Sequence, residues 1–174
     1  MRRRIDRFID DSLLGFATWY VSSKWHGKER DCVNLFAMRD LAAQVQPGAA
    51  IGHQSQIRIE CAVAQPEGYP RISATKDLVI WRHPEETAWN DIWLPVNLPR
   101  VVMEWKTRRR ARALLDFDNH DREWLKKFTK QNPGTFGYLV TVCDRKEDRS
   151  VAWAKVTDGV IAKPKEIHGT GSGD

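Results

Sequence analysis

The chain has 174 residues, 41% of them hydrophobic, and a formal net charge of +5 at pH 7. This length suits one domain with a sizeable core, and a composition with eight tryptophans excludes an intrinsically disordered chain. The positive charge is concentrated in residues 100–130, where ten Lys or Arg stand against five Asp or Glu. A polyanion would bind at such a segment.

The chain begins with a predicted amphipathic helix over residues 3–22. Its apolar residues at helical spacing are Ile5, Phe8, Ile9, Leu13, Phe16, Trp19 and Tyr20. We expect this helix to pack against the core, and an interfacial or dimerising helix is the alternative. The apolar run 13–21 is too short to span a bilayer and acidic residues precede it, which argues against export and membrane insertion.

A second helix is predicted over residues 28–46 and ends at Pro47-Gly48. Glu29, Val33 and Phe36 share one face of this helix. An acid on an apolar face suits a site between helix and sheet, although at a helix start it also interacts favourably with the macrodipole.

Apolar runs rich in β-branched and aromatic residues predict strands over residues 56–64, 71–81 and 101–106. A turn at residues 65–70 joins the first two strands into a hairpin. Within the first strand, Glu60 either adds to an acidic cluster or pairs with Arg58 and Lys106, and pairing is the favoured interpretation.

Residues 82–99 are predicted to form an inserted excursion between the second and third strands, as a lid, a substrate-contacting loop or a dimer contact. Trp89 and Trp93 are four residues apart and could share a face of a short helix. Packing against the core is their favoured role, and stacking on unpaired bases is the alternative.

Ionisable residues interrupt the second and third strands. Asp77 opens the run Asp-Leu-Val-Ile-Trp, and Glu104 and Lys106 lie within Val-Val-Met-Glu-Trp-Lys. Side chains alternate along a strand, so Glu104 and Lys106 share one face about 6.5–7 Å apart, while Trp105 points the other way. Two carboxylates and an ammonium in an apolar sheet are costly unless something binds there. A surface salt bridge between Glu104 and Lys106 is the alternative.

This set of side chains suits metal-assisted phosphodiester cleavage. Carboxylates provide the hard oxygen ligands that Mg²⁺ or Mn²⁺ prefers, and a bound metal activates water and neutralises charge on the phosphate. A lysine beside the metal can orient the attacking water and stabilise the anionic transition state.

A basic segment and a further helix, over residues 118–131, follow the third strand. The candidate nucleic-acid-binding residues are Arg108, Arg109, Arg110, Arg112, Lys126 and Lys130. A solvated turn and a soluble outer helix face are the alternative interpretation.

Strands at Phe136–Cys143 and 151–156 are predicted to complete the sheet, and residues 169–174 to form a flexible tail after one domain spanning residues 1–168. The cysteines Cys32, Cys61 and Cys143 lie in apolar elements without close spacing. Buried thiols are therefore expected rather than disulfides or a zinc site, which is typical of a cytoplasmic protein.

The residues Asp77 and Glu104-x-Lys106 resemble the motif of the PD-(D/E)xK nuclease superfamily, which has the restriction-endonuclease-like fold. The predicted order of elements, helix, three strands, helix and strand, is the αβββαβ core of that superfamily, and the resemblance covers residues 28–143. Two features depart from it: Lys76 precedes the aspartate in place of the family's proline, which is often missing, and the 27 positions that separate Asp77 from Glu104 are a long spacing for this superfamily.

The resemblance implies an α/β fold with a central mixed sheet flanked by helices, to which this chain adds its N-terminal amphipathic helix. It implies that Asp77, Glu104, the main-chain carbonyl of Trp105 and Glu29 bind Mg²⁺, with Mn²⁺ as a substitute, and that Lys106 activates the attacking water. A homodimer is often used for double-strand cutting.

The sequence therefore predicts a metal-dependent nuclease that hydrolyses DNA phosphodiester bonds, either structure-directed or of low sequence specificity, with RNA not excluded. A non-catalytic nucleic-acid-binding module or a protein-interaction module on the same fold is the alternative. The nucleic-acid-binding module would bind DNA without metal. The protein-interaction module would form a stable complex and show little salt-sensitive DNA binding.

Overall fold

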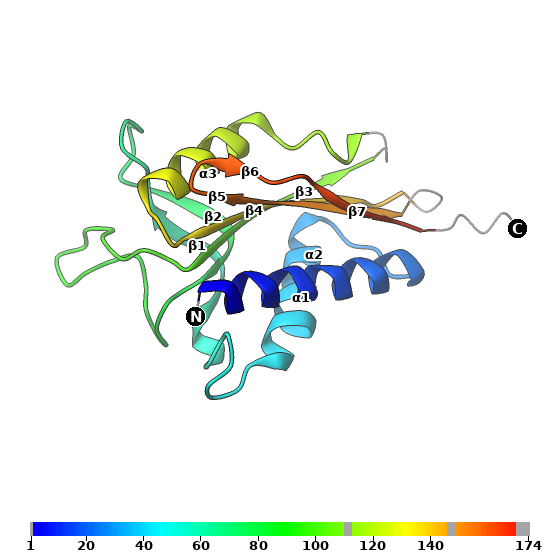
Figure 1. The fold of residues 1–174 in the computed structure, drawn as a ribbon, viewed down its shortest axis with the longest axis horizontal. Coiled ribbons are helices and arrows are strands. Elements are labelled where there is room, and N and C mark those ends of the chain that lie inside the picture. The colour runs from blue at the N-terminus through cyan, green and yellow to red at the C-terminus, as the bar shows by residue number, and fades with distance from the viewer. Residues whose placement is uncertain (1, 110–112, 146–148, 170–174) are drawn as a thin grey trace, which may run out of the picture.

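The computed structural model describes residues 2–109, 113–145 and 149–169. In this part of the chain a seven-stranded sheet lies between helices, with α1 and α2 on one face and α3 on the other (Figure 1). The α-helices are α1 (Arg2–Ser22), α2 (Glu29–Leu35) and α3 (Asn119–Gln131). The strands are β1 (Ile57–Ala64), β2 (Ser73–Ile80), β3 (Val101–Arg108), β4 (Phe136–Cys143), β5 (Ser150–Thr157), β6 (Val160–Ile161) and β7 (Lys165–His168).

The sheet is mixed, as the sequence predicts. Strands β1 to β6 are neighbours in chain order, and β7 pairs with β5 beside β6. All neighbouring pairs are antiparallel except β3 and β4, which are parallel. A parallel pair needs a crossover, and the segment containing α3 makes it. The α/β class and the flanking helices are thereby confirmed.

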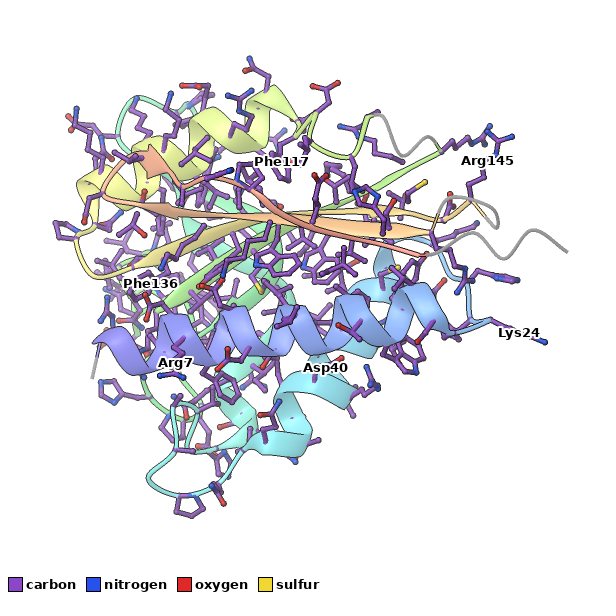
Figure 2. The ribbon with its side chains drawn as sticks, turned by 45° about the vertical axis from the view of Figure 1, so that its right-hand side comes forward. Arg7, Lys24, Asp40, Phe117, Phe136 and Arg145 are labelled. Atoms are coloured by element: carbon purple, nitrogen blue, oxygen red, sulfur yellow. The ribbon has the colours of Figure 1, made fainter. Side chains whose placement is uncertain are left out.

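Each face of the sheet is covered by its own apolar core. On the side of α1 and α2, the ring of Trp105 packs against Phe16 and Phe36, with ring centroids 5.5 and 5.3 Å apart. On the side of α3, Trp124 stacks on Phe128 and joins a cluster with Trp81. Figure 2 shows Phe117 on the α3 side of the sheet and Arg7 and Asp40 on the other.

Helix α1 packs against the sheet, which confirms the favoured interpretation. Its buried stripe is Ile5, Ile9, Leu13, Phe16, Ala17 and Tyr20. No helix in the described ranges has the length and apolar character needed to cross a membrane. The three cysteines, all among the described residues, form no disulfide; Cys32 and Cys143 are buried and Cys61 is partly buried.

The predicted single helix over residues 28–46 is wrong in its geometry. Only Glu29–Leu35 is α-helical, and Phe36–Leu41 forms a π-helix before a short 3₁₀ turn at Ala42–Gln44. In this π turn, whose hydrogen bonds run from residue i to i+5, Phe36, Ala37, Asp40 and Leu41 are all buried.

Residues 82–99 extend from the sheet as an excursion without any helix (Figure 1). The Asn90 side chain accepts hydrogen bonds from the N–H groups of Ile92 and Leu94, and Trp89 forms a β-bridge with Pro95. This turn replaces the helix, because its backbone groups are already bonded. Trp89 packs against the α3-side core, but Trp93 is 76% exposed, so the packing predicted for Trp93 is wrong.

Two further differences lie near the C-terminus. The short strands β6 and β7 were not predicted, since such brief, partly exposed runs give little apolar alternation. Gly169, the first residue of the predicted flexible tail, donates its N–H to the carbonyl of Arg149 at 2.7 Å. The rest of that tail lies outside the described residues.

Candidate active site

Strands β2 and β3 separate at the position of Asp77. Their register pairs end at Leu78 and Met103, one residue before Asp77 would meet Glu104. The Asp77 carboxylate instead accepts a hydrogen bond from the backbone N–H of Trp105 at 2.7 Å. Asp77 therefore lies inside the opening between two strands, with its carboxylate against the main chain of β3.

The neighbouring strand is distorted at the same level. Glu60 adopts a left-handed conformation with φ 49°, and the β1–β2 ladder lacks a pair at this residue. Residues two apart in a regular strand point to the same face of the sheet. Here Ile59 packs with the α1-side core, whereas Cys61 packs with the α3-side core. The strand thus turns over at Glu60, beside Asp77, and a strained backbone of this kind clusters at functional sites.

Lys76 and Glu104 form a buried ion pair on the α3 side. Their side chains are only 4% and 6% exposed, and the Lys76 ammonium also lies 3.7 Å from the centre of the Trp124 ring. Burial raises the pKa of Glu104 to about 8, while the positive charge of Lys76 opposes the rise and the carboxylates of Asp121 and Asp77 add to it.

Lys106 lies between carboxylates from two helices. Its ammonium is 3.5 Å from Asp121 Oδ2 on α3 and 3.7 Å from Glu29 Oε1 on α2, and its side chain is 33% exposed. Burial by itself would lower the pKa of Lys106, but the surrounding carboxylates, Asp121 foremost, raise it above its usual value. The group is therefore a charged ammonium that solvent and a ligand can reach.

Glu29 also contacts the end of β3, because its Oε2 accepts a hydrogen bond from the backbone N–H of Thr107 at 3.1 Å. A small cavity of about 60 Å³ lies beside it, lined by Glu29, Arg30, Val33, Ile59, Glu60 and Asp77. This volume is enough to hold a water molecule. Glu60 pairs with Arg30, and both residues line this cavity, so the predicted pairing with Arg58 and Lys106 is wrong.

The structure thus brings Asp77, Glu104, Lys106 and Glu29 to one region of the sheet, with the main chain of Trp105 beside Asp77. In the described ranges, however, no three His, Cys, Asp or Glu side chains are close enough together to hold a metal ion. Glu104 is turned to Lys76, and Glu29 to Lys106 and Thr107. The oxygen donors suit a hard cation, which would have to replace Lys76 as the partner of Glu104.

The predicted nucleic-acid contacts are only partly within the described structure. Arg108 donates to the carbonyl of Asp116 at 2.9 Å, Arg109 is exposed at the end of β3, and Lys130 is exposed on α3. Lys126 forms an ion pair with Glu123 at 2.9 Å. Arg110 and Arg112 lie outside the described residues.

Two residues of the site escaped the sequence prediction. Lys76 was noted only as the replacement for a proline, and strand alternation gives no sign that it reaches Glu104. Asp121 did leave a signal, because it precedes Trp124 and Leu125 by three and four positions and so lies on the apolar face of its helix.

Comparison with protein-family models, with curated proteins and with solved structures finds no match.

Proposed function

We propose that the protein is a metal-dependent nuclease that hydrolyses DNA phosphodiester bonds. The observation that carries this proposal is the gathering of Asp77, Glu104 and Lys106 where β2 and β3 separate. An opening between strands leaves room for a substrate, and carboxylates with a lysine are the groups this reaction needs.

The order of elements supports the same proposal. Helix α2, strands β1 to β3, helix α3 and strand β4 follow one another along the chain, in the αβββαβ order of the PD-(D/E)xK superfamily. The acid Glu29 lies at the start of the first of these helices and contacts the end of β3.

Asp77, Glu104, the carbonyl of Trp105 and Glu29 are the groups we propose for binding Mg²⁺ or Mn²⁺. The metal, when bound, would lower the pKa of water and neutralise charge on the phosphate. The chain itself would contribute the Lys106 ammonium, held by Glu29 and Asp121, to orient the attacking water. The exposed Arg109 and Lys130 would contact the DNA backbone without sequence preference.

A nucleic-acid-binding module without catalysis is the second candidate. The ion pair between Lys76 and Glu104 favours it, because Lys76 already neutralises the carboxylate that the metal would need. This module would bind DNA in the absence of metal, and its binding would not depend on Lys106.

The test is cleavage of plasmid, single-stranded and branched DNA, and of single-stranded RNA, with Mg²⁺, Mn²⁺ or EDTA. Wild type is compared with Asp77→Ala and Lys106→Ala, and with Asp6→Asn as a matched control in an ion pair with Lys155 away from the site. We expect cleavage that requires metal, that is lost in the first two variants and that persists in the control. Equal cleavage by wild type and Lys106→Ala, or DNA binding without cleavage in all four proteins, contradicts the proposal.

A further inference from the structure

Asp121 is placed in the site by the start of α3. The Asp118 carboxylate caps this helix by accepting hydrogen bonds from the N–H groups of His120 and Asp121, at 2.9 and 3.2 Å. Asp121 then shares the inward face of α3 with Trp124, Leu125 and Phe128. The cap and the apolar face together direct the Asp121 side chain towards the sheet.

No hydrogen bond within α3 compensates for the burial of the Asp121 carboxylate. Its exposed fraction is 8%, and its Oδ2 atom is buried without a hydrogen bond from any described residue. An acid in the first turn of a helix benefits from the helix dipole even when it is exposed, so the dipole does not explain the burial. A buried carboxylate oxygen without a donor is costly, and the nearby charge of opposite sign is the Lys106 ammonium at 3.5 Å.

Lys106 is held from both faces of the sheet. Glu29 reaches it from α2 and Asp121 from α3, and these helices lie on opposite sides of the sheet (Figure 1). A lysine side chain is flexible and would otherwise sample many rotamers in solvent. Two carboxylates on fixed helices confine the ammonium to the open end of the gap between β2 and β3.

We propose that Asp121 is a positioning residue that holds the Lys106 ammonium in its reactive place. This inference rests on the proposed nuclease function and extends it to a residue outside the Asp77, Glu104-x-Lys106 motif. Asp121 acts through Lys106, whose ammonium lies 3.5 Å from its Oδ2, and it is not one of the four groups proposed to bind the metal.

The first test is kinetic and uses Asp121→Asn, which keeps the shape of the side chain and removes its charge. We expect kcat to fall by about 10- to 100-fold, the range seen when a supporting partner of an active-site group is removed. KM for DNA and the Mn²⁺ concentration for half-maximal rate should stay within about twofold of wild type. Asp121→Glu should restore part of the rate, and the control Asp6→Asn should leave kcat unchanged.

The second test needs neither metal nor DNA. Lysines of the metal-free protein are labelled with acetic anhydride, and the labelling of Lys106 is compared with that of Lys155 by peptide mass spectrometry. We expect Asp121→Asn to raise the relative labelling of Lys106, and Asp6→Asn to raise that of Lys155 instead. If Asp121→Asn does not fold by circular dichroism, Asp121→Ser takes its place.

The outcomes separate the two proposals. A wild type that cleaves no nucleic acid overturns the nuclease function, and the labelling still reports whether Asp121 confines Lys106. Cleavage with unchanged kcat and unchanged labelling in Asp121→Asn overturns the positioning role. A loss of rate that excess Mn²⁺ restores also overturns it, because that result makes Asp121 a metal ligand.

Discussion

The ammonium of Lys76 contacts the carboxylate of Glu104 inside the protein, from the position immediately before Asp77. In the superfamily that the sequence resembles, the residue named in the motif for this position is a proline, often missing, which carries no charge. This chain therefore contains its own cation beside one of the two acids proposed to bind a metal. The stability of the protein and the ionisation of its site both depend on this pair.

The first prediction concerns the stability of the pair. Above pH 8, where Glu104 is ionised, Lys76→Met leaves its carboxylate buried without its counter-ion, and breaking a buried pair in this way costs about 3–5 kcal/mol of unfolding free energy. Replacing both partners, in Lys76→Met/Glu104→Leu, should recover most of that loss, since no buried charge remains. Urea unfolding above pH 8 of wild type, Lys76→Met, Glu104→Leu and the double variant measures these values. A double variant as unstable as the sum of the single changes would show that packing, rather than charge, dominates.

The second prediction concerns pH. The pKa of Glu104 is raised from 4.5 to about 8 in the folded protein, so between these values the native state keeps a proton that the unfolded chain has released. The unfolding free energy should therefore decrease as pH rises through this window, by at most about 1.4 kcal/mol per pH unit, and level off above pH 8. Glu104→Gln should remove this decrease.

Asp40 adds a similar contribution at lower pH, because burial raises its pKa from 3.8 to about 6. The range between pH 6 and 8 is therefore the one that isolates Glu104. Urea unfolding of wild type and Glu104→Gln at several pH values tests the assignment, and parallel curves for the two proteins in this range would contradict it.

The third prediction concerns the cap of α3. Asp118→Ala removes the acceptor for the N–H groups of His120 and Asp121, which should cost about 1 kcal/mol of unfolding free energy at pH 7. These hydrogen bonds lower the pKa of Asp118, so the difference from wild type should shrink as pH falls and the carboxylate gains a proton. The control is Asp116→Ala, at an exposed position two residues before the cap, which should change the unfolding free energy by less than about 0.5 kcal/mol. Thermal unfolding at pH 7 and pH 3 distinguishes a cap from a general charge effect.

Much of the fold could be predicted because its central elements are strongly patterned. The apolar residues at helical spacing predicted α1 and its buried face, and the apolar runs predicted the strands β3 and β4. The alternation of side chains along β3 predicted that Glu104 and Lys106 share one face of the sheet. The distortion at Glu60 could not be predicted, since a left-handed residue inside a strand has no signal in the apolar pattern. Beyond this distortion Cys61 and its register partner Lys76 both face the α3 side, where Lys76 reaches Glu104.

The two carboxylates that pair with Lys106 could not be predicted from the sequence either. The pairing of Lys106 with Asp121 joins β3 to a helix on one face, and its pairing with Glu29 joins it to a helix on the other. Sequence spacing relates residues within one element, whereas these contacts depend on how two helices are placed over the sheet. The π-helix at Phe36–Leu41, which buries Phe36, Ala37, Asp40 and Leu41, was not predicted either, because the apolar spacing of this segment fits a regular α-helix.

The fourth prediction concerns the binding of DNA. Arg109 is exposed at the end of β3, close to the proposed site, and a phosphate contact there releases counterions. Arg109→Ala should weaken binding to all DNA sequences alike, and should reduce the slope of log K against log salt by about 0.9.

The control for this prediction is Arg7, whose side chain is 85% exposed on α1, on the opposite side of the sheet from α3 (Figure 2). Removing it should change net charge equally but leave the slope nearly unchanged. Fluorescence anisotropy with two unrelated duplexes between 50 and 200 mM salt, without divalent metal, gives both slopes. Equal slopes for Arg109→Ala and Arg7→Ala would mean that DNA does not bind along the end of β3.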